Sequence, residues 1–84
     1  LAERRASQRR DVDWTATIRI GNEAPIPCRV INVSTGGALL ELDETIWLPS
    51  DFRIVIPEAI FEASCNVRHQ SGRSVGVMFT SSQR

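Results

Sequence analysis

The sequence of 84 residues has no lysine, no tyrosine, one histidine, two cysteines and no long apolar run. A membrane-spanning helix needs about 20 mostly apolar residues in succession, and no stretch approaches that length. A structural zinc site takes four ligands, more than His69, Cys28 and Cys65 provide. The chain also lacks the basic start and apolar middle of a secretory signal peptide. We therefore expect a cytoplasmic domain with no membrane insertion, no metal and no cofactor.

Groups that catalyse reactions or stack on nucleic-acid bases are equally scarce. With one His, no nucleophile beside a base and no carboxylates paired on a strand face, we expect no enzyme. Barrels that bind single-stranded nucleic acid use exposed aromatic side chains. Only Trp47 is expected in a loop, because the other aromatic residues fall on the presumed inner faces of strands: Trp14, Phe52, Phe61 and Phe79.

All ten basic residues are arginine, and four of them lie in the stretch "RRASQRR" from Arg4 to Arg10. Residues 1–10 contain four Arg and one Glu, whereas residues 11–84 contain six Arg and nine acidic residues. A nucleic-acid-binding domain carries basic charge over a whole face, so the mildly acidic remainder argues against DNA or RNA as a partner. The basic stretch is either a solvated tail or a holder of anions, which guanidinium groups bind through paired hydrogen bonds.

Apolar and polar residues alternate in six segments, as in half-buried strands: residues 14–20, 26–33, 38–44, 52–56, 60–69 and 74–80. Pro57 argues against a helix across the fourth and fifth segments. We expect an all-β fold, a small six-stranded antiparallel barrel over residues 13–80, with a flexible Arg-rich arm over 1–12 and a tail over 81–84. A sandwich is the alternative, but closure into a barrel removes exposed strand edges.

The two cysteines, Cys28 and Cys65, fall on apolar alternating segments. A buried free cysteine behaves as a small hydrophobic residue. We expect both thiols to be reduced and to lie in the core, and a disulfide between them is the alternative.

A second polar motif, "NVSTGG", covers residues 32–37. Asn32 and Ser34 are two residues apart, so their side chains point the same way on an extended strand. Gly37 permits a ligand or another segment to approach the backbone closely. The motif is either an ordinary turn between strands or a polar site for an anionic small molecule.

In combination these features resemble the PilZ domain, a family of bacterial receptors for the second messenger cyclic di-GMP. The family carries an RxxxR motif in an N-terminal arm, which "RASQR" from Arg5 to Arg9 matches. A [D/N]xSxxG motif follows on a six-stranded barrel, and "NVSTGG" matches it. The opening "ERR" and the strand "SVGVMF" are also similar, so the resemblance extends from about Glu3 to Phe79.

The resemblance implies how the arm would bind the nucleotide. Arg5 and Arg9 would hold the phosphates and the guanine edges, and Arg4 would add a further contact. Arg10 lies outside the motif and is expected to be a charge at the rim. The arm would close over the ligand and present a new surface to a downstream protein partner or a linked domain, which makes the domain a switch.

The resemblance also implies roles for the barrel residues. Asn32 and Ser34 would bond a guanine on the outer face, and Gly37 would shape the turn. Alternation along the fifth segment predicts that Asn66 and Arg68 project outward, where they could reach the same face. Family members often close the barrel with a C-terminal helix, which "TSSQR" does not encode, so we expect that helix to be absent or truncated. The alternative function is a PilZ-like adaptor that binds protein and no nucleotide.

Overall fold

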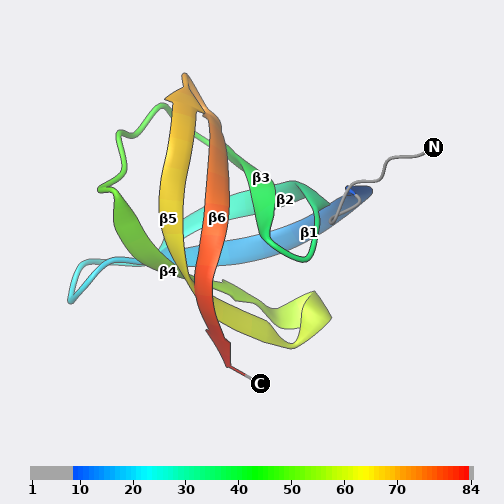
Figure 1. The fold of residues 1–84 in the computed structure, drawn as a ribbon. Helices are drawn as coiled ribbons and strands as arrows, with labels where there is room; N and C mark the ends of the chain where they lie inside the picture. The colour runs from blue at the N-terminus through cyan, green and yellow to red at the C-terminus, as the bar shows by residue number, and fades with distance from the viewer. Residues whose placement is uncertain (1–8, 84) are drawn as a thin grey trace.

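Six antiparallel strands close into a barrel in the computed structural model of the protein, which describes residues 9–83 (Figure 1). Around the barrel the order is β1-β2-β3-β6-β5-β4, and β4 pairs with β1 to close it. The strands are β1 Arg10–Arg19, β2 Ile26–Val33, β3 Gly37–Leu42, β4 Asp51–Ile56, β5 Phe61–Ser71 and β6 Ser74–Gln83, with a 3-10 helix η1 Pro57–Ala59 between β4 and β5. The barrel predicted from the sequence is therefore confirmed.

Alternation along each strand builds the core, because every second side chain points inward. The buried hydrophobic residues come from all six strands: Ala16, Ile18, Cys28, Val30, Ala38, Leu40, Leu42, Phe52, Ile54, Ile56, Ala63, Cys65, Val75 and Val77. Trp14, Phe61 and Phe79 are partly buried and pack against this cluster, whereas Trp47 is 72% exposed. The inner and outer positions predicted for the aromatic residues are confirmed.

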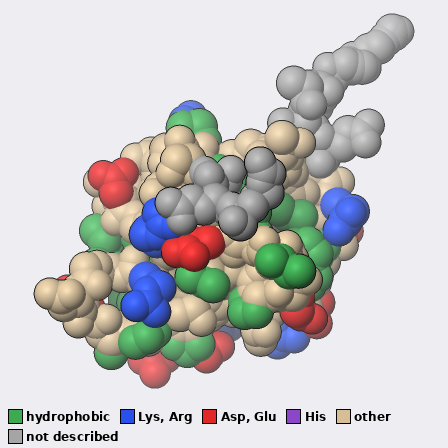
Figure 2. Space-filling model, turned by 90° about the horizontal axis from the view of Figure 1, so that it is seen from below, with side chains coloured by type: hydrophobic (Ala, Val, Ile, Leu, Met, Phe, Trp, Pro, Cys, Tyr) green, Lys and Arg blue, Asp and Glu red, His purple; other side chains and the backbone are tan. Residues whose placement is uncertain are grey.

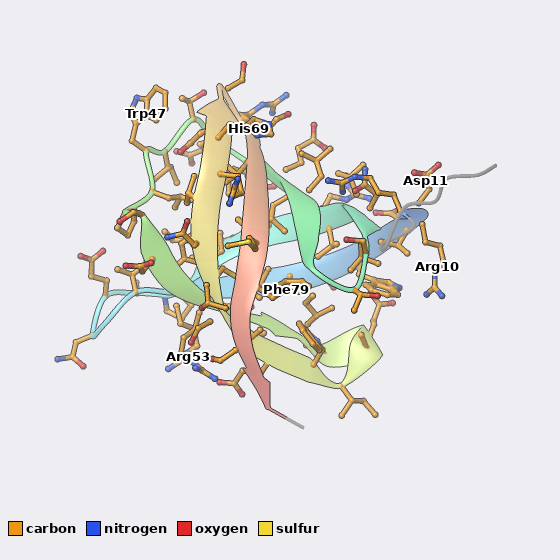
Figure 3. The ribbon with its side chains drawn as sticks, viewed as in Figure 1. Arg10, Asp11, Trp47, Arg53, His69 and Phe79 are labelled. Atoms are coloured by element: carbon orange, nitrogen blue, oxygen red, sulfur yellow. The ribbon has the colours of Figure 1, made fainter. Side chains whose placement is uncertain are left out.

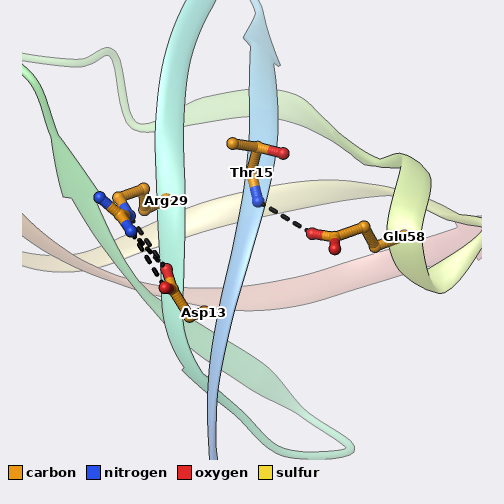
Figure 4. Close-up of polar contacts among 4 residues, drawn as sticks. All are labelled: Asp13, Thr15, Arg29 and Glu58. Atoms are coloured by element: carbon orange, nitrogen blue, oxygen red, sulfur yellow. Dashed lines mark hydrogen bonds and ion pairs between the residues drawn. The ribbon is translucent and has the colours of Figure 1, made fainter.

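The seam between β1 and β4 is short and has a side-chain extension. Only three residues of β1, Thr17 to Arg19, pair with β4. Beyond them the backbone N–H of Thr15 donates to Oε1 of Glu58 at 3.2 Å, as Figure 4 shows. Glu58 of η1 therefore accepts a β1 hydrogen bond where the ladder to β4 has ended, so no backbone donor is left open at this point of the seam.

Two strands extend further than the alternation predicts. β1 begins at Arg10, inside the range expected for the arm, and β6 continues to Gln83, inside the expected tail. In β1 the reason is the partner strand, because Arg10 pairs with Val33 and Asp11 pairs with Asn32. Backbone pairing requires no apolar side chain, so a polar segment joins a ladder without showing the pattern.

Charged side chains of both signs are interspersed on the face that Figure 2 shows. On the outer face of β1 and β2, for example, Arg29 forms a bidentate pair with Asp13, with hydrogen bonds of 3.0 Å to both carboxylate oxygens (Figure 4). Both side chains are more than half exposed, and such surface pairs add at most about 1 kcal/mol. Among residues 9–83, no helix is long and apolar enough to cross a membrane.

Cys28 and Cys65 are free and buried, as predicted. Burial, with the Asp43 carboxylate adding to it, raises the pKa of Cys28 to about 12. Burial likewise raises the pKa of Cys65 to about 12, against the opposing charge of Arg53. The ordinary pKa of a cysteine is near 9, so unfolding releases thiol protons at a lower pH than the folded barrel does.

The free energy of unfolding should therefore be unaffected by the thiols below pH 9 and fall as the pH rises from about 9 to about 12. We expect a loss of about 1–2 kcal/mol between pH 9 and pH 10, measured by urea denaturation. The sequence has no lysine or tyrosine, so no other side chain titrates in this range. The Cys28→Ala/Cys65→Ala variant should show a flat profile, and an unchanged slope in that variant would contradict the assignment to the thiols.

Candidate functional site

Pairing of β1 with β2 brings the end of the arginine stretch next to the "NVSTGG" motif. Arg10 lies opposite Val33 and Asp11 opposite Asn32 in this ladder, so Arg9, one residue before β1, lies beside the motif. A guanidinium N–H of Arg9 (Nη1) donates to Oδ1 of Asn32 at 2.6 Å. The two motifs, 23 positions apart in the sequence at these residues, are therefore in direct contact.

A β-bulge directs Asn32 to the outside of the barrel. Cys28 and Val30 point inward, and unbroken alternation would turn Asn32 inward as well. Between Val30 and Asn32, however, the register with β3 shifts by one residue, from Val30 opposite Leu40 to Asn32 opposite Leu39. A bulge of this kind redirects the side chains that follow it. Val33 then packs against the core, and Asn32 is left facing outward.

Ser34 and Gly37 close the turn between β2 and β3. The backbone N–H of Ser34 donates to the carbonyl oxygen of Gly37 at 2.8 Å, and the Ser34 hydroxyl donates to the same oxygen at 3.4 Å. The N–H of Phe79 in β6 donates to the Gly36 carbonyl at 2.8 Å. The turn is therefore attached to β6 on one side, and Ser34 lies one residue beyond the end of β2, close to Asn32.

At Gly37, the close approach that the motif suggested is made by β6. Gly37 is buried and pairs with Met78. A Cβ added at Gly37 would clash with the carbonyl oxygen of Val77. The glycines with positive φ among residues 9–83 are Gly21 and Gly72, so Gly37 is required here for contact between strands and not for left-handed backbone.

Strand register extends the site beyond the two motifs. Asn32 lies opposite Leu39, Leu39 lies opposite Gly76, and Gly76 lies opposite His69. Paired residues project from the same face of a sheet. Asn32, Leu39, Gly76 and His69 therefore form a row across β2, β3, β6 and β5, which we call the outer row.

The His69 ring covers Gly76 in this row. A Cβ added at Gly76 would lie 2.5 Å from Cε1 and 2.9 Å from Nδ1 of His69, so the imidazole occupies the space that a side chain would take. His69 is exposed and lies over β5 and β6 in Figure 3. From the sequence, His69 was considered only as a metal ligand or a catalytic group. The signal that could have found it is the register of β5 with β6, which alternation alone does not give.

Asn66 and Arg68 of β5 lie next to the outer row, beside Met78 of β6. Met78 lies opposite Gly37 on one side and Asn66 on the other, and Arg68 Nη1 donates to its sulfur at 3.6 Å. Asn66 donates to Oδ1 of Asp51 at 3.0 Å. Asn66 and Arg68 therefore project outward as predicted, and each is already engaged by a neighbour.

Of the four arginines of the basic stretch, Arg9 and Arg10 lie within the residues that the structure describes. Arg4 and Arg5 lie outside the described residues. Arg10 is next to Arg9, but its guanidinium lies over the ring of Trp14, 5.8 Å from the ring centroid. Arg9, which bonds Asn32, and Arg10, which lies over Trp14, therefore have different partners. Among residues 9–83 there is no group of three His, Cys, Asp or Glu side chains that could hold a metal ion.

The comparison with family models identifies the family of this closed six-stranded barrel. The model of the PilZ domain matches residues 3–84, nearly the whole chain. The chain therefore belongs to the PilZ domain family, whose members are in general receptors for cyclic di-GMP and not catalysts. No curated protein matches the chain.

Proposed function

We propose that this domain binds cyclic di-GMP between its arginine arm and the outer row, and acts as a ligand-dependent switch. The observation that carries the proposal is the 2.6 Å hydrogen bond from Arg9 to Asn32, which joins the two motifs. This bond holds the two side chains next to each other, so a nucleotide that contacts both needs little further ordering of them at this point.

The groups at this contact suit a ligand that has both phosphates and guanines. A guanidinium carries five N–H donors, of which one is used on Asn32, so Arg9 can also donate to a phosphate or to guanine O6 and N7. The Asn32 amide nitrogen provides two further donors. Arg4 and Arg5 would supply additional guanidinium groups from the arm, and Ser34 a hydroxyl from the turn.

The outer row provides an area on which a purine can lie. Leu39 is apolar, and the His69 ring over Gly76 is flat, exposed and aromatic. Imidazole is among the side chains on which unpaired bases stack. In this arrangement Arg9 and Asn32 hold the polar edge of the ligand, while Leu39 and His69 support a base face.

The switch follows from the position of Arg9 where the arm meets the barrel. A ligand that contacts the arm and the outer row at the same time stabilises the closed form, in which the arm lies on the barrel. It shifts the equilibrium between the open and closed forms only by its greater affinity for the closed form. A partner protein or a linked domain would then recognise the closed surface.

Isothermal titration calorimetry with cyclic di-GMP tests the proposal, and cyclic di-AMP is the matched control because it has the same phosphates without guanine O6. We expect saturable binding of cyclic di-GMP and clearly weaker binding of cyclic di-AMP. A folded domain that gives no saturable heat at about 50 µM nucleotide, a concentration well above Kd for a micromolar receptor, would reject the proposal and favour the adaptor that binds only protein.

A further inference from the structure

Trp47 is the largest side chain that the barrel leaves in solvent. It lies in the loop over residues 43–50 between β3 and β4 and is 72% exposed. Its neighbours Ile46 and Leu48 are partly buried and pack against the core. Residues 46 and 48 take the inward positions, and residue 47 lies between them on the outside.

One side chain, Gln70 of β5, holds the loop on both sides of Trp47. Its Nε2 donates to the carbonyl oxygen of Ile46 at 2.6 Å, and its Oε1 accepts from the backbone N–H of Leu48 at 3.3 Å. The N–H of Val67 donates to the Ser50 carbonyl at 2.8 Å further along the loop. The backbone under Trp47 is thus fixed by hydrogen bonds, so a contact with this indole carries a small entropic cost of ordering.

The charges around Trp47 indicate which partner fits. Asp43 and Glu44 are exposed in the same loop, and neither forms an ion pair within residues 9–83. Arg73 donates to the backbone carbonyl of Asp43 at 3.5 Å and not to its carboxylate. The indole face attracts cations, and Trp and Arg are the residues most enriched in interface hot spots.

We propose that the loop around Trp47 is a docking surface for a partner-protein segment that presents an arginine or lysine beside an apolar side chain. The cation would lie on the indole face and against Asp43 and Glu44. In Figure 3 Trp47 lies at the same end of the barrel as His69 and away from Arg10. The proposal rests on the residues of the loop and does not depend on nucleotide binding.

The probe is an amidated 12-residue peptide of alternating Arg and Leu, with its Glu-for-Arg counterpart as control. Binding is followed in a 1H–15N spectrum through the indole N–H signals of the two tryptophans, assigned with Trp47→Phe. We expect the arginine peptide to shift the Trp47 signal and to leave Trp14 unchanged, and the glutamate peptide to shift neither. Trp47→Ala should weaken binding by about tenfold or more, as for an interface hot spot.

Asp43→Asn/Glu44→Gln should weaken peptide binding several-fold and reduce its dependence on salt. Gln70→Ala should weaken it without removing the indole, because the loop is then no longer held on both sides. The proposal is overturned by an unshifted Trp47 signal at about 1 mM peptide, the limit of weak interfaces, or by binding that Trp47→Ala leaves unchanged. A Trp47 signal that shifts with protein concentration alone would instead identify a second copy of the chain as the occupant and also overturn it.

Discussion

Replacing Arg9 by alanine should weaken the binding of cyclic di-GMP by about 10- to 150-fold, which corresponds to the 1.5–3 kcal/mol of a hydrogen bond to a charged group. The loss has two sources, because Arg9 would contact the ligand and already holds Asn32 through the 2.6 Å bond. Calorimetry at two salt concentrations measures the loss of affinity. Salt screens the long-range attraction between Arg9 and the nucleotide, so the part of the loss that comes from direct contact should persist at the higher concentration.

Arg10→Ala is the matched control, because it removes the same charge one residue away. Arg10 lies over the ring of Trp14, whereas Arg9 contacts Asn32. We expect nucleotide affinity within about threefold of the unmodified protein, and a loss of about 0.5–1 kcal/mol of stability from the cation–π contact. Equal losses of affinity for Arg9→Ala and Arg10→Ala would mean that net charge, and not a specific contact, attracts the nucleotide.

A double-mutant cycle separates the bond to Asn32 from the contact with ligand. If the Arg9–Asn32 bond positions both side chains for the nucleotide, Arg9→Ala and Asn32→Ala should be non-additive, with the pair costing less than the sum of the single changes. Additive losses would show that each residue contacts the ligand independently, and the bond would then have no part in preparing the site.

The barrel could be predicted from the sequence because the alternation of apolar and polar residues within each strand indicates which positions are buried. Inner positions such as Ile18, Val30 and Ile54 alternate with outer ones, and each segment is short and ends at a turn. The prediction needed only local pattern. The start of β1 at Arg10 was missed because those residues join the ladder through their backbone while their side chains stay exposed.

The site could be predicted only in part, because its assembly depends on register. The sequence named Arg9 and Asn32, and the structure describes the bond between them. Alternation would have turned Asn32 toward the core beside Val30, and the register shift that prevents this leaves no local mark in the residue types. His69 entered the outer row in the same way, since its pairing with Gly76 is set by the β5–β6 hairpin as a whole.

Gly37→Ala should lower the stability of the barrel by about 3 kcal/mol, at the upper end of the cost of overpacking. The added methyl group would clash with the carbonyl oxygen of Val77, and a backbone atom in a ladder cannot move aside without disturbing the pairing of β3 with β6. For a domain of this size the melting temperature should fall by roughly 12–24 °C, which thermal denaturation followed by circular dichroism measures without ligand.

Gly76→Ala is the matched control in the facing strand. A Cβ there meets the His69 ring at 2.5 Å, and a side chain can rotate away where a backbone carbonyl cannot. We expect a change in stability of less than about 1 kcal/mol, since alanine also relieves the entropic cost of a glycine within a strand. Similar melting temperatures for the two variants would contradict the close approach of β3 and β6 at Gly37.

The same pair of variants separates a structural role in the motif from a role in binding. Apparent affinity falls with the fraction of folded protein when the ligand binds only the folded state. The loss of nucleotide binding in Gly37→Ala should therefore diminish at low temperature, where the barrel is refolded. Gly76→Ala should stay folded and still bind more weakly, because the displaced His69 ring no longer supports a base. Unchanged affinity in Gly76→Ala would remove His69 from the site and leave the two motifs to bind the nucleotide alone.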